Sequence, residues 1–137
     1  MKKILLGFVV IFCLSTTAAF SQAATPATHT NAPKAAISFD ESTHDFGTVP
    51  QGTPVTYVFS FKNTSKVPLV LTSVSPSCGC TTPEWPKEPI KPGAAATIKA
   101  TYNAAAAGPF TKTITVISNA ETQNVILTIK GEVKAKS

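Results

Sequence analysis

Two cysteines separated by one residue, Cys78 and Cys80 with Gly79 between them, are the residues most suited to chemistry in this sequence. In an extended strand the α-carbons of residues i and i+2 lie about 6.6 Å apart. This is near the upper limit of about 6.8 Å for a disulfide. A bend at Gly79 would shorten the distance, because glycine adopts backbone conformations that other residues avoid. The spacing therefore permits a disulfide that closes a very small loop.

Three roles for Cys78 and Cys80 remain open at this point. They could form a structural pin, as a disulfide or a buried thiol pair that shapes a turn; they could be a redox pair; or they could bind copper(I), a soft cation that suits two thiolates. We favour the pin, because the sequence places no histidine nearby and no Cys-X-X-Cys at a helix start to lower a cysteine pKa. We expect no cofactor and, apart from the weak copper alternative, no metal site.

The segment that follows the cysteines has a proline at every third position: Pro83, Pro86, Pro89 and Pro92. A polyproline II helix has three residues per turn, and proline cannot donate to a sheet ladder, so we predict a rigid crossover between strands or sheets. Trp85 lies within it. Either Trp85 covers the open end of the fold, as large aromatic side chains often do, or Trp85, Pro83 and Pro86 form a surface patch that binds a partner.

The remaining polar motifs are typical of turns and surface positions. Asp45-Phe46-Gly47 resembles a kinase motif, but no glycine-rich loop or catalytic loop accompanies it, so we predict a turn with Phe46 buried. His44 is interpreted as a surface or hydrogen-bonded strand residue, and Asn63-Thr64-Ser65 as a polar hairpin turn. There is no nucleophile elbow and no paired carboxylate on a helix. We therefore predict no catalytic residues and a non-enzymatic protein.

Apolar and polar residues alternate through most of the chain from Ile37 onward, and this period is typical of strands with one buried face. One segment, residues 69–74, is apolar on both faces, which favours a central strand. A broken edge strand is expected over residues 37–49, anchored by Phe39 and Phe46, and a short strand about Cys80–Thr82. The pattern predicts an all-β fold, an immunoglobulin-like antiparallel β-sandwich of about seven strands. The other alternating segments are residues 53–63, 94–102, 109–118 and 124–133.

The first residues have the pattern of a secretory signal peptide. The chain begins MKK, continues with the apolar ILLGFVVIFCL, and ends this region with small residues that permit cleavage after Ser21 or Ala23. We prefer residues 1–23 as the signal peptide. A lipid anchor on Cys13 is disfavoured, because Phe12 precedes it. Residues 24–36 are expected to be a flexible tether, and residues 37–135 the sandwich domain. The predicted location is periplasmic or extracellular, without a membrane span after cleavage.

Composition narrows the choice of partners. The net charge is +5 and the chain contains no arginine, the preferred residue for bidentate contacts to guanine and phosphate. Nucleic acid is therefore not an expected partner. After signal cleavage only two cysteines remain, and these give at most one internal bridge. The fold must depend on its own hydrophobic core.

Several landmarks together resemble one bacterial family. They are Asp45-Phe46-Gly47, the strand end with Phe59, Phe61 and Asn63, the run Ser77-Cys78-Gly79-Cys80-Thr81, and Pro92-Gly93. This set is similar to the domain of unknown function 1573. The resemblance implies a secreted or cell-envelope protein, often from the Bacteroidetes group, with a sandwich similar to that of major sperm protein, PapD and Hydin modules. It implies no established activity.

These observations lead to one expected function and one alternative. We expect an exported single-domain β-sandwich that acts as a non-enzymatic protein-binding or scaffolding module of the cell envelope, with another protein as its partner. The alternative is a small periplasmic thiol-redox or copper(I)-handling protein that uses Cys78 and Cys80.

Overall fold

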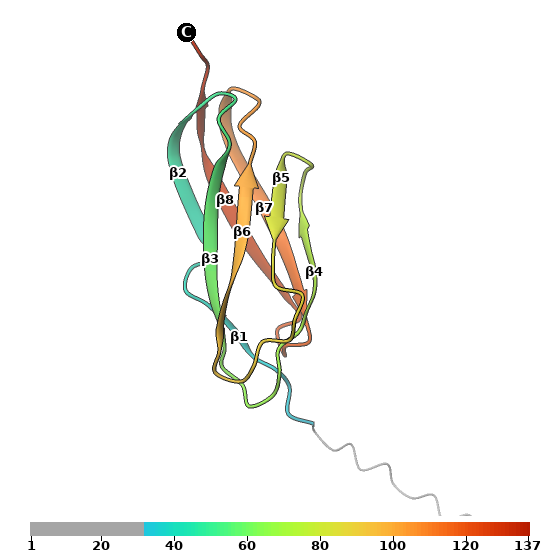
Figure 1. The fold of residues 1–137 in the computed structure, drawn as a ribbon. Coiled ribbons are helices and arrows are strands. Elements are labelled where there is room, and N and C mark those ends of the chain that lie inside the picture. The colour runs from blue at the N-terminus through green and yellow to red at the C-terminus, as the bar shows by residue number, and fades with distance from the viewer. Residues whose placement is uncertain (1–31) are drawn as a thin grey trace, which may run out of the picture. The chain divides into compact units, whose positions relative to one another are not determined.

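The computed structural model describes residues 32–137, so the predicted signal peptide and most of the predicted tether lie outside the described residues. Residues 32–137 form eight strands and no helix, and the strands are arranged as in Figure 1. The strands are β1 (Ile37–Phe39), β2 (Thr43–Pro50), β3 (Val55–Asn63), β4 (Leu71–Pro76), β5 (Thr81–Glu84), β6 (Ala95–Tyr102), β7 (Gly108–Ser118) and β8 (Asn124–Lys134).

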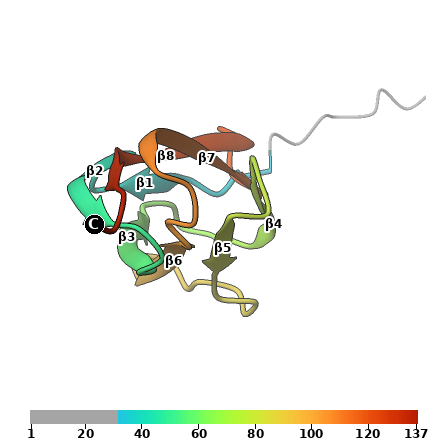
Figure 2. The same ribbon diagram turned by 90° about the horizontal axis from the view of Figure 1, so that it is seen from above.

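Two four-stranded sheets stack face to face, as the view along the strands in Figure 2 shows. The first sheet has the order β1-β3-β6-β5 and the second the order β2-β8-β7-β4. This is the strand order of a constant-type immunoglobulin domain, whose first strand is here divided between the sheets. The predicted all-β sandwich is therefore confirmed.

The broken first strand explains why eight strands are present instead of about seven. β1 pairs antiparallel with β3 in the first sheet. The chain then crosses over, and β2 pairs parallel with β8 in the second sheet. The sandwich is thus antiparallel in all its strand pairings except this one.

Alternation along the strands correctly predicted the core. Phe59, Ile98, Ile114, Leu127 and Ile129 are fully buried between the sheets. Their neighbours in sequence face outward, because successive side chains of a strand point to opposite faces. The folded domain also begins earlier than predicted. The sequence placed Ala35 in the tether, but it is buried and bridges to Ala120.

The prediction that residues 69–74 form a central strand is wrong. β4 pairs only with β7 and is the edge of its sheet. A bulge between Leu71 and Ser73 shifts the alternation, so Leu71 and Val74 both face the core although they are three residues apart. Leu69 belongs to a separate bridge with Ile90. Together these irregularities produce a segment that is apolar at odd and even positions.

Two connections can be compared with the predictions. The proline-rich segment joins β5 and β6, which are neighbours in one sheet, so of the two predicted forms it connects strands and not sheets. The crossover from β4 to β5 is the short turn that contains both cysteines. Asn63-Thr64-Ser65 begins the connection from β3 to β4, which lie in different sheets, so it is not a hairpin turn.

Candidate functional site

The two cysteines are joined by a disulfide in the turn between the sheets. Their α-carbons are 5.3 Å apart, well within the range for a bridge. Backbone hydrogen bonds fix the turn: the Thr81 N–H donates to the Cys78 carbonyl, and the Asn103 N–H donates to the Cys80 carbonyl at 3.0 Å. Gly79 is exposed and does not have a positive φ. The bend that shortens the distance therefore does not depend on glycine.

Both cysteines of this disulfide are partly buried. Within residues 32–137 no group of three or more cysteine, histidine or acidic side chains is placed to hold a metal ion. Cys80 packs against the hydrophobic core, and Cys78 is half-buried. A structural pin remains our prediction for this pair, and the small loop that it closes sets its contribution to the free energy of unfolding.

Replacing both cysteines by serine should lower the free energy of unfolding by only about 1.5 kcal/mol, because a bridge across three residues removes little entropy from the unfolded chain. Urea denaturation of Cys78→Ser/Cys80→Ser beside the wild type would measure the loss. Wild-type protein kept reduced should match the variant. A loss of unfolding free energy several times larger would contradict the view that the bridge only shapes the turn.

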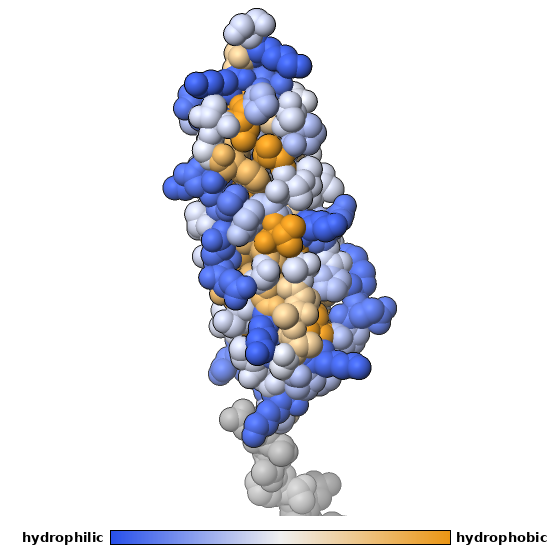
Figure 3. All heavy atoms as spheres, turned by 60° about the vertical axis from the view of Figure 1, so that its left-hand side comes forward, coloured by the Kyte–Doolittle hydropathy of each residue, from blue (hydrophilic) through white to orange (hydrophobic). Residues whose placement is uncertain are grey.

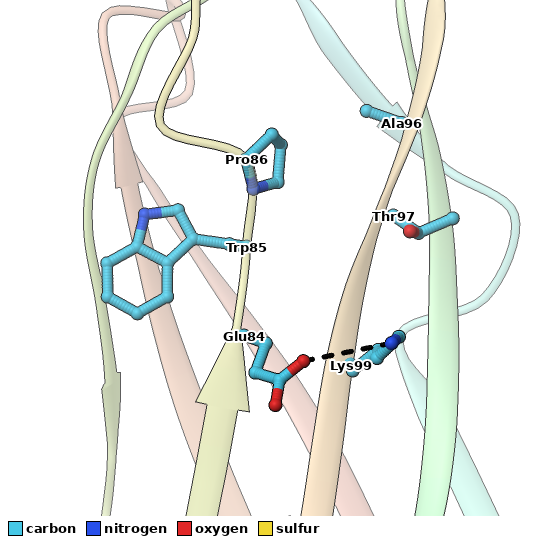
Figure 4. Close-up of a pocket in the computed structure, with 6 residues that line it drawn as sticks. All are labelled: Glu84, Trp85, Pro86, Ala96, Thr97 and Lys99. Carbon is cyan, nitrogen blue, oxygen red and sulfur yellow. Dashed lines mark ion pairs between the residues drawn. The ribbon is translucent and has the colours of Figure 1, made fainter.

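At the other end of β5 the chain leaves the sheet, and an opening forms beside β6. β5 pairs with β6 only from Thr81 to Glu84, where Glu84 lies opposite Lys99. Beyond Glu84 the Trp85–Pro86 segment diverges from β6, as Figure 4 shows. The cavity between them has a volume of about 390 Å³. We call it the β5–β6 notch; its lining residues are Glu84, Trp85, Pro86, Ala96, Thr97 and Lys99.

The backbone of Thr97 faces this notch. On the β5 side of β6 the Asn103 N–H donates to the Cys80 carbonyl. Because backbone groups of alternate residues point to the same side of a strand, the N–H and C=O of Thr97 also point to that side. Asn63 N–H donates to the Ala94 carbonyl on the opposite side, in agreement with this alternation. No described strand pairs with Thr97 here, so its backbone groups are unpaired by the protein.

The predicted patch residues have different positions around the notch. In Figure 4 the Pro86 ring and the Glu84 carboxylate point toward β6, whereas the Trp85 indole points away from Thr97 and Lys99. Trp85 is half-buried against the core, and Lys87 Nζ lies 2.9 Å from its ring centroid. Pro83 lies inside β5, opposite Ala100, and does not line the notch. The structure thus brings Trp85 and Pro86 to the site and leaves Pro83 in the sheet.

The Trp85 indole anchors the segment that forms one wall of the notch. We expect Trp85→Ala to lower the free energy of unfolding by about 2 kcal/mol, less than for a fully buried tryptophan, because the ring is only half-buried. Trp85→Phe should retain most of the stability. Urea denaturation of both variants would measure this. Unchanged stability in Trp85→Ala would show that the indole is a contact surface and not an anchor.

The charged side chains in the strands and loop around the notch are exposed, and more of them are lysines than glutamates. Glu84 Oε2 lies 3.7 Å from Lys99 Nζ, and both side chains are more than half exposed, so this ion pair contributes little stability. Lys62 lies opposite Ala95 on the neighbouring strand. The segment also carries Lys87, Lys91 and Glu88. Of these charged residues only Glu84 and Lys99 line the notch itself.

The Asp45-Phe46-Gly47 motif forms a bulge in β2 and not the predicted turn. Phe46 and Gly47 lie opposite the single residue Gly131 of β8. The Gly47 N–H donates to Asp45 Oδ1 at 2.8 Å. This hydrogen bond, helped by Lys130 at 3.6 Å, lowers the pKa of Asp45. Phe46 is half-buried and packs against the core. These contacts give the motif a structural role in the sandwich.

His44 lies where β2 and β3 meet at the side of the sandwich. Its ring stacks on Tyr57 with the centroids 3.5 Å apart and meets Phe46 edge to face. Its Nδ1 is 3.3 Å from Glu41 Oε1. Figure 3 shows this side, with apolar residues in a narrow strip between hydrophilic ones. The prediction of a hydrogen-bonded strand residue agrees with this geometry, but the sequence did not indicate the stacking on Tyr57.

The sequence missed the β6 side of the site. Ala96, Thr97 and Lys99 were recognised only as members of an alternating strand. The one available signal was the proline-rich stretch after Glu84, because proline ends a ladder, but the pairing partner of that ladder was unknown. The disulfide and the notch lie at opposite ends of β5, so the structure does not join the two candidate sites.

The strand order and the divided first strand define an immunoglobulin-like β-sandwich. Residues 37–133 match the family described as protein of unknown function (DUF1573), and the chain belongs to this family. No curated protein matches the sequence. No helix within residues 32–137 is long and apolar enough to cross a membrane.

Solved structures with the same fold come from bacteria and from human. A protein of unknown function from Porphyromonas gingivalis W83 is 20% identical with a TM-score of 0.67, over 77% of this chain and 50% of that one. The ASH/PapD-like domain 7 of human CEP192 is 10% identical with a TM-score of 0.62, over 86% and 97%. The secreted serine protease VesC of Vibrio cholerae is 14% identical with a TM-score of 0.56, over 71% and 23%.

These similarities concern the fold alone at such identities. The chain spans half the length of the Porphyromonas gingivalis protein and less than a quarter of VesC. The protease activity named for VesC therefore gives no catalytic residue to this chain.

Proposed function

We propose that this protein is an exported, non-enzymatic binding module of the cell envelope that docks a protein partner at the β5–β6 notch. The signal-peptide pattern of residues 1–23 supports export. The likeness of its fold to sandwiches such as the ASH/PapD-like domain 7 of human CEP192 supports a module without catalysis.

The observation that carries the proposal is the interruption of the first sheet at Glu84. A strand edge with unpaired N–H and C=O groups is a template for another chain. Here such an edge, at Thr97, borders a cavity with the half-buried Pro86 and the Trp85 segment as its other wall. Backbone hydrogen-bonding groups beside an apolar wall are what an extended peptide requires of its binding site.

Site-specific photo-crosslinking in the producing cells tests this function. A photoreactive phenylalanine at position 97 should give a crosslink to one reproducible envelope protein. The same residue at position 126 is the matched control, because Ile126 is 58% exposed on the other sheet. Crosslinks that are equal at both positions, or that occur only at position 126, would contradict the proposal.

The same experiment separates the notch from the disulfide. The crosslink at position 97 should persist in Cys78→Ser/Cys80→Ser, because the two sites lie at opposite ends of β5. Loss of the crosslink in a variant that still folds would favour a function that depends on the thiols.

A further inference from the structure

We infer that the occupant of the β5–β6 notch is an extended, acidic peptide segment that continues the first sheet by pairing with the backbone of Thr97. This inference rests on the proposed function and specifies the chemistry of the partner.

The pairing follows from the geometry of β6. Its even-numbered residues bond to β3 through a ladder that runs without interruption from Val55–Tyr102 to Lys62–Ala95. Its odd-numbered residues face β5, which supplies partners only as far as Lys99. An incoming strand would therefore find one donor and one acceptor at Thr97, already held in extended conformation by β3. Such preorganisation lowers the entropy cost of binding.

The preference for an acidic segment follows from the charges. Lys99 and Glu84 are the charged residues that line the notch, and Lys62 lies opposite Ala95, on the same exposed face as Thr97 and Lys99, so two lysines are beside Thr97 against one glutamate. The Glu84–Lys99 pair is exposed and weak, so a carboxylate of the ligand can compete for the Lys99 ammonium. Opposite charges across an interface raise the association rate and select among partners.

The chain contains a second unpaired edge that serves as an internal control. Asp40 N–H donates to the Ser60 carbonyl on the outer side of β3, so the N–H of Val58 points to the same outer side. β1 covers only Phe61 to Asn63 of this edge. The edge at Val58 therefore has the backbone groups of a docking strand, but it is not the edge that borders the notch.

A peptide-display selection tests the inference. Random twelve-residue peptides would be selected on the purified mature protein, and the affinities of the winning peptides measured by fluorescence anisotropy. We expect enrichment of Asp and Glu, and affinity that falls as salt screens the lysines. Thr97→Pro, which removes the N–H that faces the notch, should weaken binding about tenfold, as loss of a hydrogen bond from a strand pairing does. Val58→Pro should leave binding unchanged.

Both proline variants remove an N–H that is not part of the β3–β6 ladder, so both should fold; melting curves would verify this. If Thr97→Pro does not fold, a series of peptides can be used instead, each N-methylated at a different residue and so lacking one backbone donor. Methylation of the residue that pairs with Thr97 should abolish binding. Peptides without acidic enrichment, or peptides that bind Thr97→Pro as well as the wild type, would overturn the inference. Either result would leave the crosslinking test of the proposed function unaffected. Absence of a crosslink at position 97 would contradict the proposed function even if peptides bind.

Discussion

Asn63→Ala should lower the free energy of unfolding by about 3 kcal/mol, among the largest effects expected for a polar residue of this domain. Asn63 is 0% exposed. Its Nδ2 donates to the carbonyl oxygens of Val67 at 2.8 Å and Ile90 at 2.9 Å. Its Oδ1 accepts from the Ser65 N–H at 3.0 Å and the Ser65 hydroxyl at 2.7 Å. Alanine would remove all four bonds: the Ile90 carbonyl would keep only the Leu69 N–H and the Val67 carbonyl only the Ser65 hydroxyl, and the Ser65 N–H would lose its acceptor in a part-buried site.

Asn119→Ala is the matched control for this prediction. Asn119 also bonds to two backbone groups: its Oδ1 accepts from the Val70 N–H at 2.8 Å, and its Nδ2 donates to the Pro68 carbonyl at 3.1 Å. Asn119 is exposed, however, and water can replace these bonds, so its loss should cost about 1 kcal/mol or less. Urea denaturation of both variants would compare them. Equal losses would contradict the view that burial makes Asn63 essential.

Gly131→Ala should also lower the free energy of unfolding by about 3 kcal/mol, at the upper end of the cost of overpacking. A β-carbon at Gly131 would lie 2.7 Å from the carbonyl oxygen of Gly47 and 3.0 Å from the Phe110 ring. The backbone of the Gly47 bulge cannot rotate away as a flexible side chain could. The variant should therefore displace β2 from β8, which pair on either side of this bulge.

Gly79→Ala provides the control, because a β-carbon there meets nothing within 4 Å and the residue does not have a positive φ. Its stability should be within about 0.5 kcal/mol of the wild type, as for most exposed substitutions. Thermal unfolding followed by circular dichroism would measure both variants. A stable Gly131→Ala protein would show that the contact between β2 and β8 is looser than described.

The sequence was sufficient to predict the layers of the fold, because alternation reports which face of each strand is buried. Phe59 and Phe61 on β3, and Leu127 and Ile129 on β8, have the predicted orientation. It was not sufficient where the alternation is interrupted. The bulge at Leu71–Ser73 made an edge strand resemble a central one, and the bulge at Phe46–Gly47 resembled a turn. In both cases an extra residue changes the period without leaving the sheet.

The candidate site was predicted only in part, for a related reason. Trp85 and Pro86 were recognisable because of their residue types. Thr97 was not recognisable, because its proposed role depends on backbone groups that no neighbouring strand pairs with, and not on its own side chain. Which strand lies beside β6, and at which residue that strand departs, depends on contacts between residues far apart in the sequence. No local pattern encodes where β5 ends its pairing at Glu84.

Amide hydrogen exchange at Thr97 is the most direct test of the central claim, that the first sheet is left open beside β6. In the free protein the Thr97 amide should exchange rapidly, whereas the amide of Ile98, which faces β3 in the uninterrupted ladder, should be protected. A bound acidic peptide should slow exchange at Thr97 and leave Ile98 unchanged. A Thr97 amide as well protected as Ile98 in the free protein would mean that this edge is already paired, and the notch would then not be a docking site.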